Sequence, residues 1–324
     1  MGAWRGPHRP LRLGSPARPL RLVGRAQRGR DRRPGDVVRP TPPVRPAQRP
    51  SPPLRHRSDR GTRDLLGEPH RCSVSGRRRP LTEKRVRTGV PGLDEMLHGG
   101  FLPGSVVLVR GAPGTGKTSL GLQFLIHGAT KENETGLLIS FEEFPRSLYR
   151  DAASLGWDLR SLEEAGKLHL IFTSPEVFLA GLETPSSIVE RLIREHDVRR
   201  VVLDSITHFN RLASDRHELR RIYTRVANGL RREGITSLLL GEEARSEAIR
   251  SDKGGLAFVA ETIILLRYVE VESAIQRAIV VLKMRGSDHD KAIRRYEIHE
   301  GGLIIGDVFE GRQGLLRGIS YRAA

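Results

Sequence analysis

The chain has 324 residues and carries 55 Lys and Arg against 38 Asp and Glu, a formal net charge of +17 at pH 7. Because 37% of its residues are hydrophobic, most of the chain can bury a core, which excludes a wholly disordered protein. Its single cysteine, Cys72, excludes an internal disulfide and a cysteine-based zinc site. No apolar run reaches the about 18 residues of a membrane helix, so we expect a cytoplasmic protein with no membrane contact.

The first 80 residues differ in composition from the remainder. Residues 1–80 contain 21 Arg, no Lys and five acids, a formal charge of +16, whereas residues 81–324 hold 34 bases and 33 acids. A segment rich in Arg and Pro without apolar periodicity cannot offset its ordering entropy, so we predict a disordered extension over 1–80. Three interpretations stay open: an inert extension or misassigned start, contact with nucleic-acid phosphates, or a targeting segment.

From residue 81 onward, short apolar runs alternate with helical stretches. This alternation predicts a mainly parallel sheet with helices on both faces. After residue 260 the strands follow one another without long helices, which indicates an antiparallel or mixed edge. The predicted strands are 105–110, 136–141, 168–173, 201–204, 237–240, 262–267 and 278–284, and the predicted helices are 117–127, 146–155, 186–196 and 216–232.

A glycine-rich motif follows the first predicted strand and precedes the first predicted helix. Its sequence is Gly111-Ala112-Pro113-Gly114-Thr115-Gly116-Lys117-Thr118, the pattern G-x-x-x-x-G-K-T. Glycines permit a tight loop whose backbone N–H groups face phosphate oxygens, and the following helix adds the positive end of its dipole. We expect Lys117 to neutralise the β- and γ-phosphates of a nucleotide and the hydroxyl of Thr118 to bind Mg²⁺.

Acidic residues follow three of the other predicted strands. Glu142 and Glu143 come after the second strand, and their side chains point in opposite directions if both keep strand geometry. One of them could orient the water that attacks the γ-phosphate. Asp204 ends the apolar run 201–204 and is expected to hold Mg²⁺. The pair 242–243 after the fifth strand is either a further sensor of the phosphate or a solvated turn.

The loop, the paired glutamates and the aspartate together resemble the core of RecA-type ATPases. The flanking segments narrow this resemblance to KaiC-like ATPases over residues 85 to 309. The matching segments are TGVPGLDEML (88–97) with GGF (99–101), SFEEFP (140–145), SLGWDL (154–159), and KMRGSDH (283–289) followed by EGG (300–302). The resemblance implies an α/β fold of the P-loop NTPase type over 81–312, with antiparallel strands near its end and a tail at 313–324.

The resemblance also implies a nucleotide site. It assigns ATP binding to the loop residues Gly111, Gly114, Thr115, Gly116, Lys117, Thr118 and Ser119, with Ser154 approaching the nucleotide. The paired glutamates become the catalytic carboxylates. Lys283 and Arg285 would contact the γ-phosphate of a neighbouring subunit, and Met284, Ser287, His289 and Glu300 would line that nucleotide from the same side. This arrangement implies a homo-oligomeric ring, usually a hexamer, with ATP and Mg²⁺ between subunits.

Family members that act in circadian timing have two such modules, whereas this chain has one such loop motif and no internal repeat. We therefore expect neither autokinase nor timekeeping activity. The favoured interpretation is a slow regulatory ATPase with a possible protein signalling partner. A DNA-dependent ATPase of the RecA/RadA group, with DNA loops at 210–215 and 244–255, is an alternative that the near-neutral domain does not favour. A non-catalytic ATP-binding scaffold is a second alternative, against which the intact loop lysine and carboxylates argue.

Overall fold

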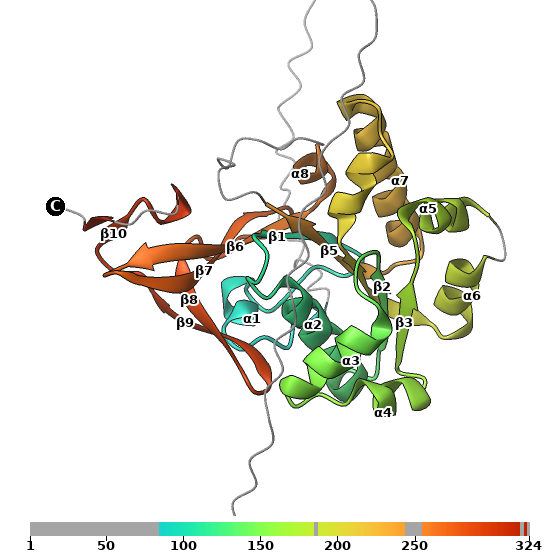
Figure 1. Ribbon diagram of the computed structural model, residues 1–324, viewed down its shortest axis with the longest axis horizontal. Helices are drawn as coiled ribbons and strands as arrows, with labels where there is room; N and C mark the ends of the chain where they lie inside the picture. Colours follow the sequence, from blue (N-terminus) through green and yellow to red (C-terminus); the bar gives the residue numbers. More distant parts are fainter. Residues whose placement is uncertain (1–83, 185–186, 244–254, 318–320, 323–324) are drawn as a thin grey trace, which may run out of the picture. The chain divides into compact units, whose positions relative to one another are not determined.

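The computed structural model describes residues 84–184, 187–243, 255–317 and 321–322 (Figure 1). The predicted disordered extension 1–80 and most of the proposed DNA loop 244–255 lie outside the described residues. The tail predicted at 313–324 is described only in part, and the division of the chain at residue 312 stays a prediction. Within the described ranges, no helix combines the length and the apolar character that crossing a membrane requires.

A nine-stranded sheet organises the described residues, in the order β3-β2-β4-β5-β1-β6-β7-β8-β9. The six strands from β3 to β6 run parallel, and β7, β8 and β9 continue the sheet in antiparallel pairs. The strands are β1 (Val106–Gly111), β2 (Thr135–Ser140), β3 (Leu168–Phe172), β4 (Val198–Asp204), β5 (Thr236–Glu242), β6 (Thr262–Val271), β7 (Ala274–Met284), β8 (Arg294–His299) and β9 (Gly302–Val308), and a separate ribbon pairs β10 (Arg312–Gln313) with β11 (Tyr321–Arg322).

Helices cover both faces of the parallel part of this sheet. They are α1 (Leu93–Met96), α2 (Lys117–Lys131), α3 (Pro145–Ser154), α4 (Leu159–Glu164), α5 (Pro175–Glu183), α6 (Ile188–Glu195), α7 (Arg216–Arg232) and α8 (Leu256–Val259), with 3₁₀ turns η1 (Ile206–Arg211) and η2 (Leu315–Arg317). All seven predicted strands and all four predicted helices are present. The predicted helix 186–196 begins at Ile188, because Ser187 caps it by accepting from the backbone N–H of Glu190.

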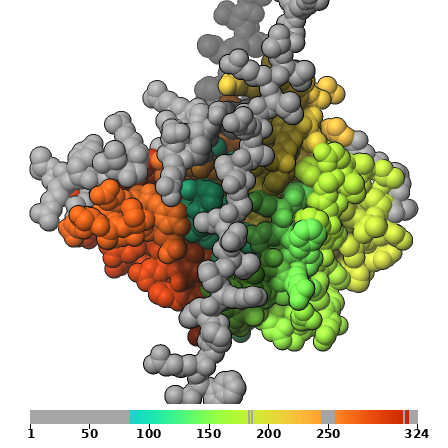
Figure 2. Space-filling view, viewed as in Figure 1, coloured from blue at the N-terminus to red at the C-terminus, as the bar shows by residue number. Residues whose placement is uncertain are grey.

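Two hydrophobic cores lie on opposite faces of the sheet, because successive strand residues point to opposite sides. In β1, Val107 and Val109 pack on the α2 face, whereas Val106 and Leu108 pack on the α7 face. The first core also takes in α3 and α4, and the second takes in α5 and α6. In the space-filling view the antiparallel strands (orange) and the helices α3–α6 (green to yellow) lie on opposite sides (Figure 2).

The hairpin β6–β7 is longer than the sequence predicted, and its turn explains the difference. Glu272 and Ser273 join the two strands, and both have positive φ angles of 51° and 62°. Such angles at both turn residues match the twist of the flanking strands, but Asn-Gly or Asp-Gly is the usual sequence signal. Because the sequence lacks that signal, it did not predict the last residues of β6 or the first residues of β7. The prediction of an antiparallel or mixed edge after residue 260 is confirmed, because β6 pairs in parallel with β1 and antiparallel with β7.

Two helical glycines provide a matched test of packing. A Cβ on Gly128 of α2 would lie 2.4 Å from Nε of Arg200, which is buried, whereas a Cβ on Gly229 of α7 would lie at an ordinary 3.7 Å from Leu182. We expect Gly128→Ala to destabilise the fold by about 1–3 kcal/mol through overpacking. Gly229→Ala should be neutral or stabilise by up to about 1 kcal/mol through helix propensity. Chemical denaturation of both variants measures this, and equal stability of the two would contradict the packing shown here.

Candidate functional site

The loop between β1 and α2 requires glycine at two positions. Gly114 and Gly116 have φ angles of 79° and 87°, in the left-handed region that other residues rarely adopt. Packing adds to this requirement, since a Cβ on Gly116 would lie 2.5 Å from Cδ1 of Ile298 in β8. Tyr296 of β8 also supports the loop, because its buried hydroxyl donates to the carbonyl of Thr115 at 2.5 Å. Burial raises the pKa of this hydroxyl, so it stays a donor.

Lys117 is the first residue of α2, and its side chain is buried beneath the loop. Its ammonium donates to the carbonyls of Gly111 and Ala112 at 3.0 and 3.1 Å. Burial lowers the pKa of this ammonium, while the carboxylates of Glu242, Asp204 and Glu142 act in the opposite direction. The lysine therefore lies among three carboxylates, which the ends of β5, β4 and β2 bring to one edge of the sheet.

A hydrogen bond joins the start of α2 to the end of β4. The hydroxyl of Thr118 donates to Oδ2 of Asp204 at 2.7 Å. Burial raises the pKa of Asp204, against the lowering effects of Thr118 and Lys117. These two oxygens fit a Mg²⁺ ion, which prefers few protein ligands and completes its shell with water and phosphate. The described ranges contain no group of three or more His, Cys, Asp and Glu arranged for a metal.

The paired glutamates lie beyond the end of β2 and have different surroundings. The strand ends at Ser140, whose Oγ accepts from the backbone N–H of Glu143 at 2.9 Å. The two glutamates therefore lie outside the strand, and the alternation of strand side chains does not decide where they point. Glu143 is half-buried, and its pKa is raised by burial and then by the carboxylate of Asp204. Glu142 is 57% exposed, and its Oε2 lies 3.3 Å from Nε2 of His208 in η1. Both acids thus adjoin the site, one beside Asp204 and one toward solvent.

The pair 242–243 separates into two roles. Glu242 ends β5, and its charge acts on Lys117, so it is one of the three carboxylates around that lysine. Glu243 is buried and forms an ion pair with Arg267 of β6 at 2.9 Å, which makes it a structural residue. His208 and Tyr296 also belong to the site, although the sequence did not predict them. Neither stands in a motif, and only the packing of η1 and β8 brings them to the site.

The segment 283–289 lies at the opposite edge of the sheet from the loop. Because β7 is antiparallel to β6, Met284 pairs with Thr262 at the start of β6. The backbone N–H of Arg285 donates to Glu261, whose own N–H donates to Val106 at the start of β1. The loop follows the other end of that strand, about 16 Å away at the usual strand rise. Within one chain, this segment and the loop are therefore not brought together.

Side chains of this segment have distinct environments. Lys283 donates to the carbonyls of Ala257 and Ala260 at 2.6 and 2.7 Å, at the end of α8. The side chain of Met284 is in the hydrophobic core. Arg285 is exposed. Ser287 accepts from Arg85 at 2.7 Å, and His289 is half-buried, with an Nδ1 that has no hydrogen-bond partner among the described residues.

Glu300 lies close to the segment that follows Ser154 in the same chain. Glu300 lies in the turn between β8 and β9, and a Cβ on Gly156 would lie 3.3 Å from its Cγ. The neighbouring N–H of Gly301 donates to the carbonyl of Leu155 at 2.8 Å. The hydroxyl of Ser154 donates to the carbonyl of Asp151 at 2.7 Å. The turn that carries Glu300 is therefore attached to the end of α3 in the same subunit.

The parallel sheet, the loop at the end of its strand β1, and the carboxylate at the end of β4 define an ATPase domain of the RecA superfamily. A family model described as "ATPase: KaiC" matches residues 86–308, and the chain belongs to this family. It is 38% identical over 239 residues to the circadian clock oscillator protein KaiC of Thermostichus vulcanus, covering 74% of this chain and 45% of that protein. It is 35% identical to KaiC of Picosynechococcus sp. over 241 residues (74% and 46%) and to KaiC 1 of Synechocystis sp. over 239 residues (74% and 45%). The chain spans less than half the length of these relatives.

Replacing Asp204 should reveal the cost of its burial. A carboxylate whose pKa is raised in the folded state destabilises the fold above that pKa, and this cost disappears as the pH falls through it. We expect Asp204→Asn to raise the melting temperature at pH 7.5 without Mg²⁺, by about 2–4 °C for each kcal/mol gained. The gain should shrink as the pH falls from 7.5 into the acidic range, because the native Asp204 takes up a proton at a higher pH than it does in the unfolded chain.

Thermal unfolding measured across this pH range tests the expectation. The matched control is Asp307→Asn, which changes an exposed carboxylate of β9 by the same chemistry. A lower melting temperature for Asp204→Asn at pH 7.5, or a gain of the same size for both variants, would contradict the burial cost assigned to Asp204.

Proposed function

We propose that this protein binds ATP with Mg²⁺ at the loop 111–118 and hydrolyses it slowly, as a regulatory ATPase that forms a ring of identical subunits. The observation that carries the proposal is the hydrogen bond of 2.7 Å between Thr118 and Asp204, beside the buried Lys117. It brings together, from two elements, the hydroxyl and the carboxylate that a nucleotide-bound Mg²⁺ needs.

Each part of the site has a proposed role. The N–H groups of the loop, including that of Ser119, and the start of α2 bind phosphate oxygens. Lys117 neutralises the β- and γ-phosphates, and Thr118 and Asp204 hold Mg²⁺. When bound, that ion offsets the charge that develops on the phosphates. The family membership and the geometry support these roles, since all of these groups lie at the carboxyl edge of the parallel strands, where α/β proteins place ligands.

We assign the orientation of the attacking water to Glu142 and an assisting role to Glu143. The charge of Glu142 acts on both Lys117 and Asp204, whereas Glu143 is not among the charges that act on Lys117. The carboxylates of Asp204 and Asp151 repel the charge of Glu143 and raise its pKa. A residue that orients the water must reach the γ-phosphate, and Lys117 marks its position. His208 lies 3.3 Å from Glu142 and would hold its carboxylate in place.

Arg285 is proposed to act on the nucleotide of a neighbouring subunit. It is exposed, and the length of β1 separates it from its own loop, so a second copy is the partner it can serve. Such a head-to-tail contact closes into a ring, for which we propose a hexamer. Lys283 is held by the end of α8 and would position the segment, while the backbone of Met284 and the side chains of Ser287 and His289 line the same nucleotide.

Glu300 is assigned differently. The resemblance implies a contact from the partner side, but the turn of Glu300 is attached to the segment after Ser154 of its own subunit. In addition, Ile298 and Leu303, which flank this turn, pack against Gly116 of the loop. We therefore propose that Glu300 and Ser154 approach the nucleotide of their own subunit. No observation on the described residues favours the alternative, a DNA-dependent recombination ATPase.

Substitution of the glutamates tests the assignment of the base. Glu142→Gln should lower kcat by about 10²–10⁴-fold, the usual contribution of a general base, and Glu143→Gln should lower it less. The double variant should still bind ATP, because neither side chain holds the loop. Measuring phosphate release and the binding of a fluorescent ATP analogue separates these effects, with Glu297→Gln on exposed β8 as the matched control. If Glu143→Gln lowers kcat more than Glu142→Gln, Glu143 is the residue that orients the water. If the double variant hydrolyses ATP normally, neither glutamate has a catalytic role.

Mixing two inactive variants tests action between subunits. Arg285→Ala should lower kcat by about 10³-fold, as expected for loss of an arginine finger, without changing the melting temperature. Lys117→Ala should be inactive at its own loop but keep Arg285. In rings formed from equal amounts of both variants, about a quarter of the sites combine an intact loop with an intact Arg285, so activity should reappear. Arg191→Ala serves as the control, and mixed rings without activity would place Arg285 outside the active site.

A further inference from the structure

A second cavity lies at the sheet edge opposite the loop 111–118. It has a volume of about 620 Å³ and is lined at the starts of three parallel strands by Thr135 of β2, Arg199 and Arg200 of β4 and Thr236 of β5. This volume is in the range of small-molecule sites. No residue assigned above to nucleotide binding lines it. The chemistry of its lining must therefore be explained separately.

The lining is strongly basic. Six of its side chains are Lys or Arg, against three carboxylates. The basic residues are Lys84, Arg85, Arg87, Lys167, Arg199 and Arg200, and the acidic residues are Glu132, Glu134 and Asp197. A concave surface with an excess of positive charge concentrates anions, because its field lines converge in the cavity.

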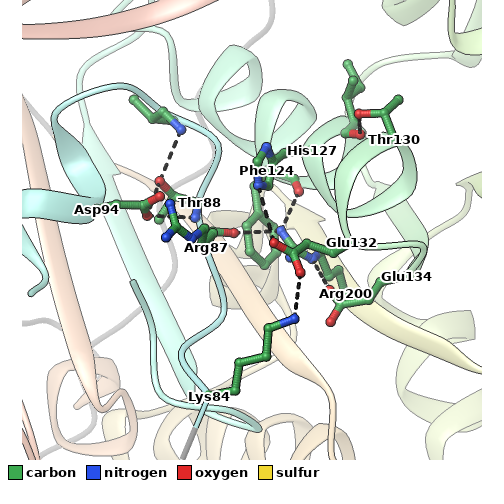
Figure 3. Close-up of polar contacts among 12 residues, drawn as sticks. Lys84, Arg87, Thr88, Asp94, Phe124, His127, Thr130, Glu132, Glu134 and Arg200 are labelled. Atoms are coloured by element: carbon green, nitrogen blue, oxygen red, sulfur yellow. Dashed lines mark hydrogen bonds and ion pairs between the residues drawn. The ribbon is translucent and has the colours of Figure 1, made fainter. Parts of the chain in front are cut away.

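Arg200 is the central feature of this cavity (Figure 3). Its side chain is only 1% exposed, and its guanidinium lies 4.5 Å above the ring of Phe124. Nε forms an ion pair with Glu134 at 2.6 Å, and Nη1 donates to the carbonyls of Arg87 and Phe124 at 2.8 and 2.9 Å. Nη2 is buried and has no hydrogen-bond partner among the described residues. A buried guanidinium donor without an acceptor is costly, and an anionic oxygen in the cavity would satisfy it.

The other basic side chains of the cavity differ in whether they already have hydrogen-bond or ion-pair partners. The exposed side chain of Arg87 is paired with no described residue, and the backbone carbonyl of the same residue holds Arg200 (Figure 3). Lys84 pairs with Glu132 at 2.9 Å while 86% exposed, and Lys167 donates to the side chain of Asn133 at 2.7 Å. Such exposed pairs are weak and rearrange readily around a ligand. Arg85 donates to the carbonyl of Gly100 and to the hydroxyl of Ser287, so its guanidinium is already used and is not a proposed ligand.

We propose that this cavity binds a small phosphorylated anion, with Nη2 of Arg200 and the guanidinium of Arg87 as its main ligands and Lys84 and Lys167 at its rim. Phosphate suits this donor set better than a single carboxylate, because its several charged oxygens can accept from two guanidinium groups and an ammonium together. The site is independent of the loop 111–118, since the strands of the sheet separate the two edges.

Isothermal titration calorimetry with inorganic pyrophosphate tests the proposal. The full-length chain should carry Lys117→Ala, so that the loop 111–118 contributes little, and the titration is run without Mg²⁺ in 0.3 M NaCl to suppress diffuse charge effects. We expect one saturable binding event per chain. Adding Arg87→Glu should weaken it by about ten- to a hundredfold, because a hydrogen bond to a charged group is replaced by repulsion. The matched control Arg221→Glu changes an exposed arginine of α7 outside the cavity by the same charge and should leave binding unchanged.

A second variant addresses Arg200 itself. Arg200→Lys keeps the charge but removes Nη2, so it should also weaken pyrophosphate binding while its melting temperature reports whether the core is intact. The Arg-rich segment 1–80 is present in every variant, so weak binding by that segment cancels in the comparison. The proposal is overturned if the Lys117→Ala chain binds no pyrophosphate, or if Arg87→Glu and Arg221→Glu weaken binding equally.

Discussion

The hydrogen bond between Thr118 and Asp204 is the constraint on which the rest of the site depends. It joins the first turn of α2 to the end of β4, two elements that are 86 residues apart in sequence. The bond can form only because β1 and β4 lie on either side of β5 in one parallel sheet, with their carboxyl ends at the same edge. Lys117, Glu142 and Glu242 gather at this edge for the same reason. Burial lowers the pKa of the lysine, and the neighbouring carboxylates offset part of that effect.

The antiparallel strands are part of the site rather than an appendage. Tyr296 and Ile298 of β8 contact the loop 111–118 directly, one by a hydrogen bond to Thr115 and the other by packing on Gly116. The loop is therefore held between α2, which follows it directly, and the β8–β9 hairpin, whose Tyr296 is 181 residues from Thr115 in sequence. The preceding antiparallel strand, β7, ends next to Arg285 at the opposite edge of the sheet. The antiparallel strands therefore contact the loop at one edge and reach the segment around Arg285 at the other.

The two edges of the sheet thus present different chemistry. The carboxyl edge combines a glycine loop with carboxylates, which suits a nucleotide with Mg²⁺. The amino edge has an excess of guanidinium and ammonium groups around the buried Arg200, which suits an anion without a metal. Arg200 also fills the space beside Gly128 of α2, so the same side chain that lines the cavity fixes the distance between α2 and β4. Packing and charge are therefore coupled at this edge.

Of the net charge of +17, residues 1–80 carry +16 and residues 81–324 carry +1, a difference that the sequence alone establishes. The sequence also determined the parallel sheet, the loop and Asp204, because apolar strand runs and glycine positions are local patterns. It could not determine the environments of Glu142 and Glu143, the contact of Tyr296 with the loop, or the cavity at Arg200. These depend on which strands become neighbours and where each one ends, and only the tertiary structure decides that, through packing between residues far apart in the chain.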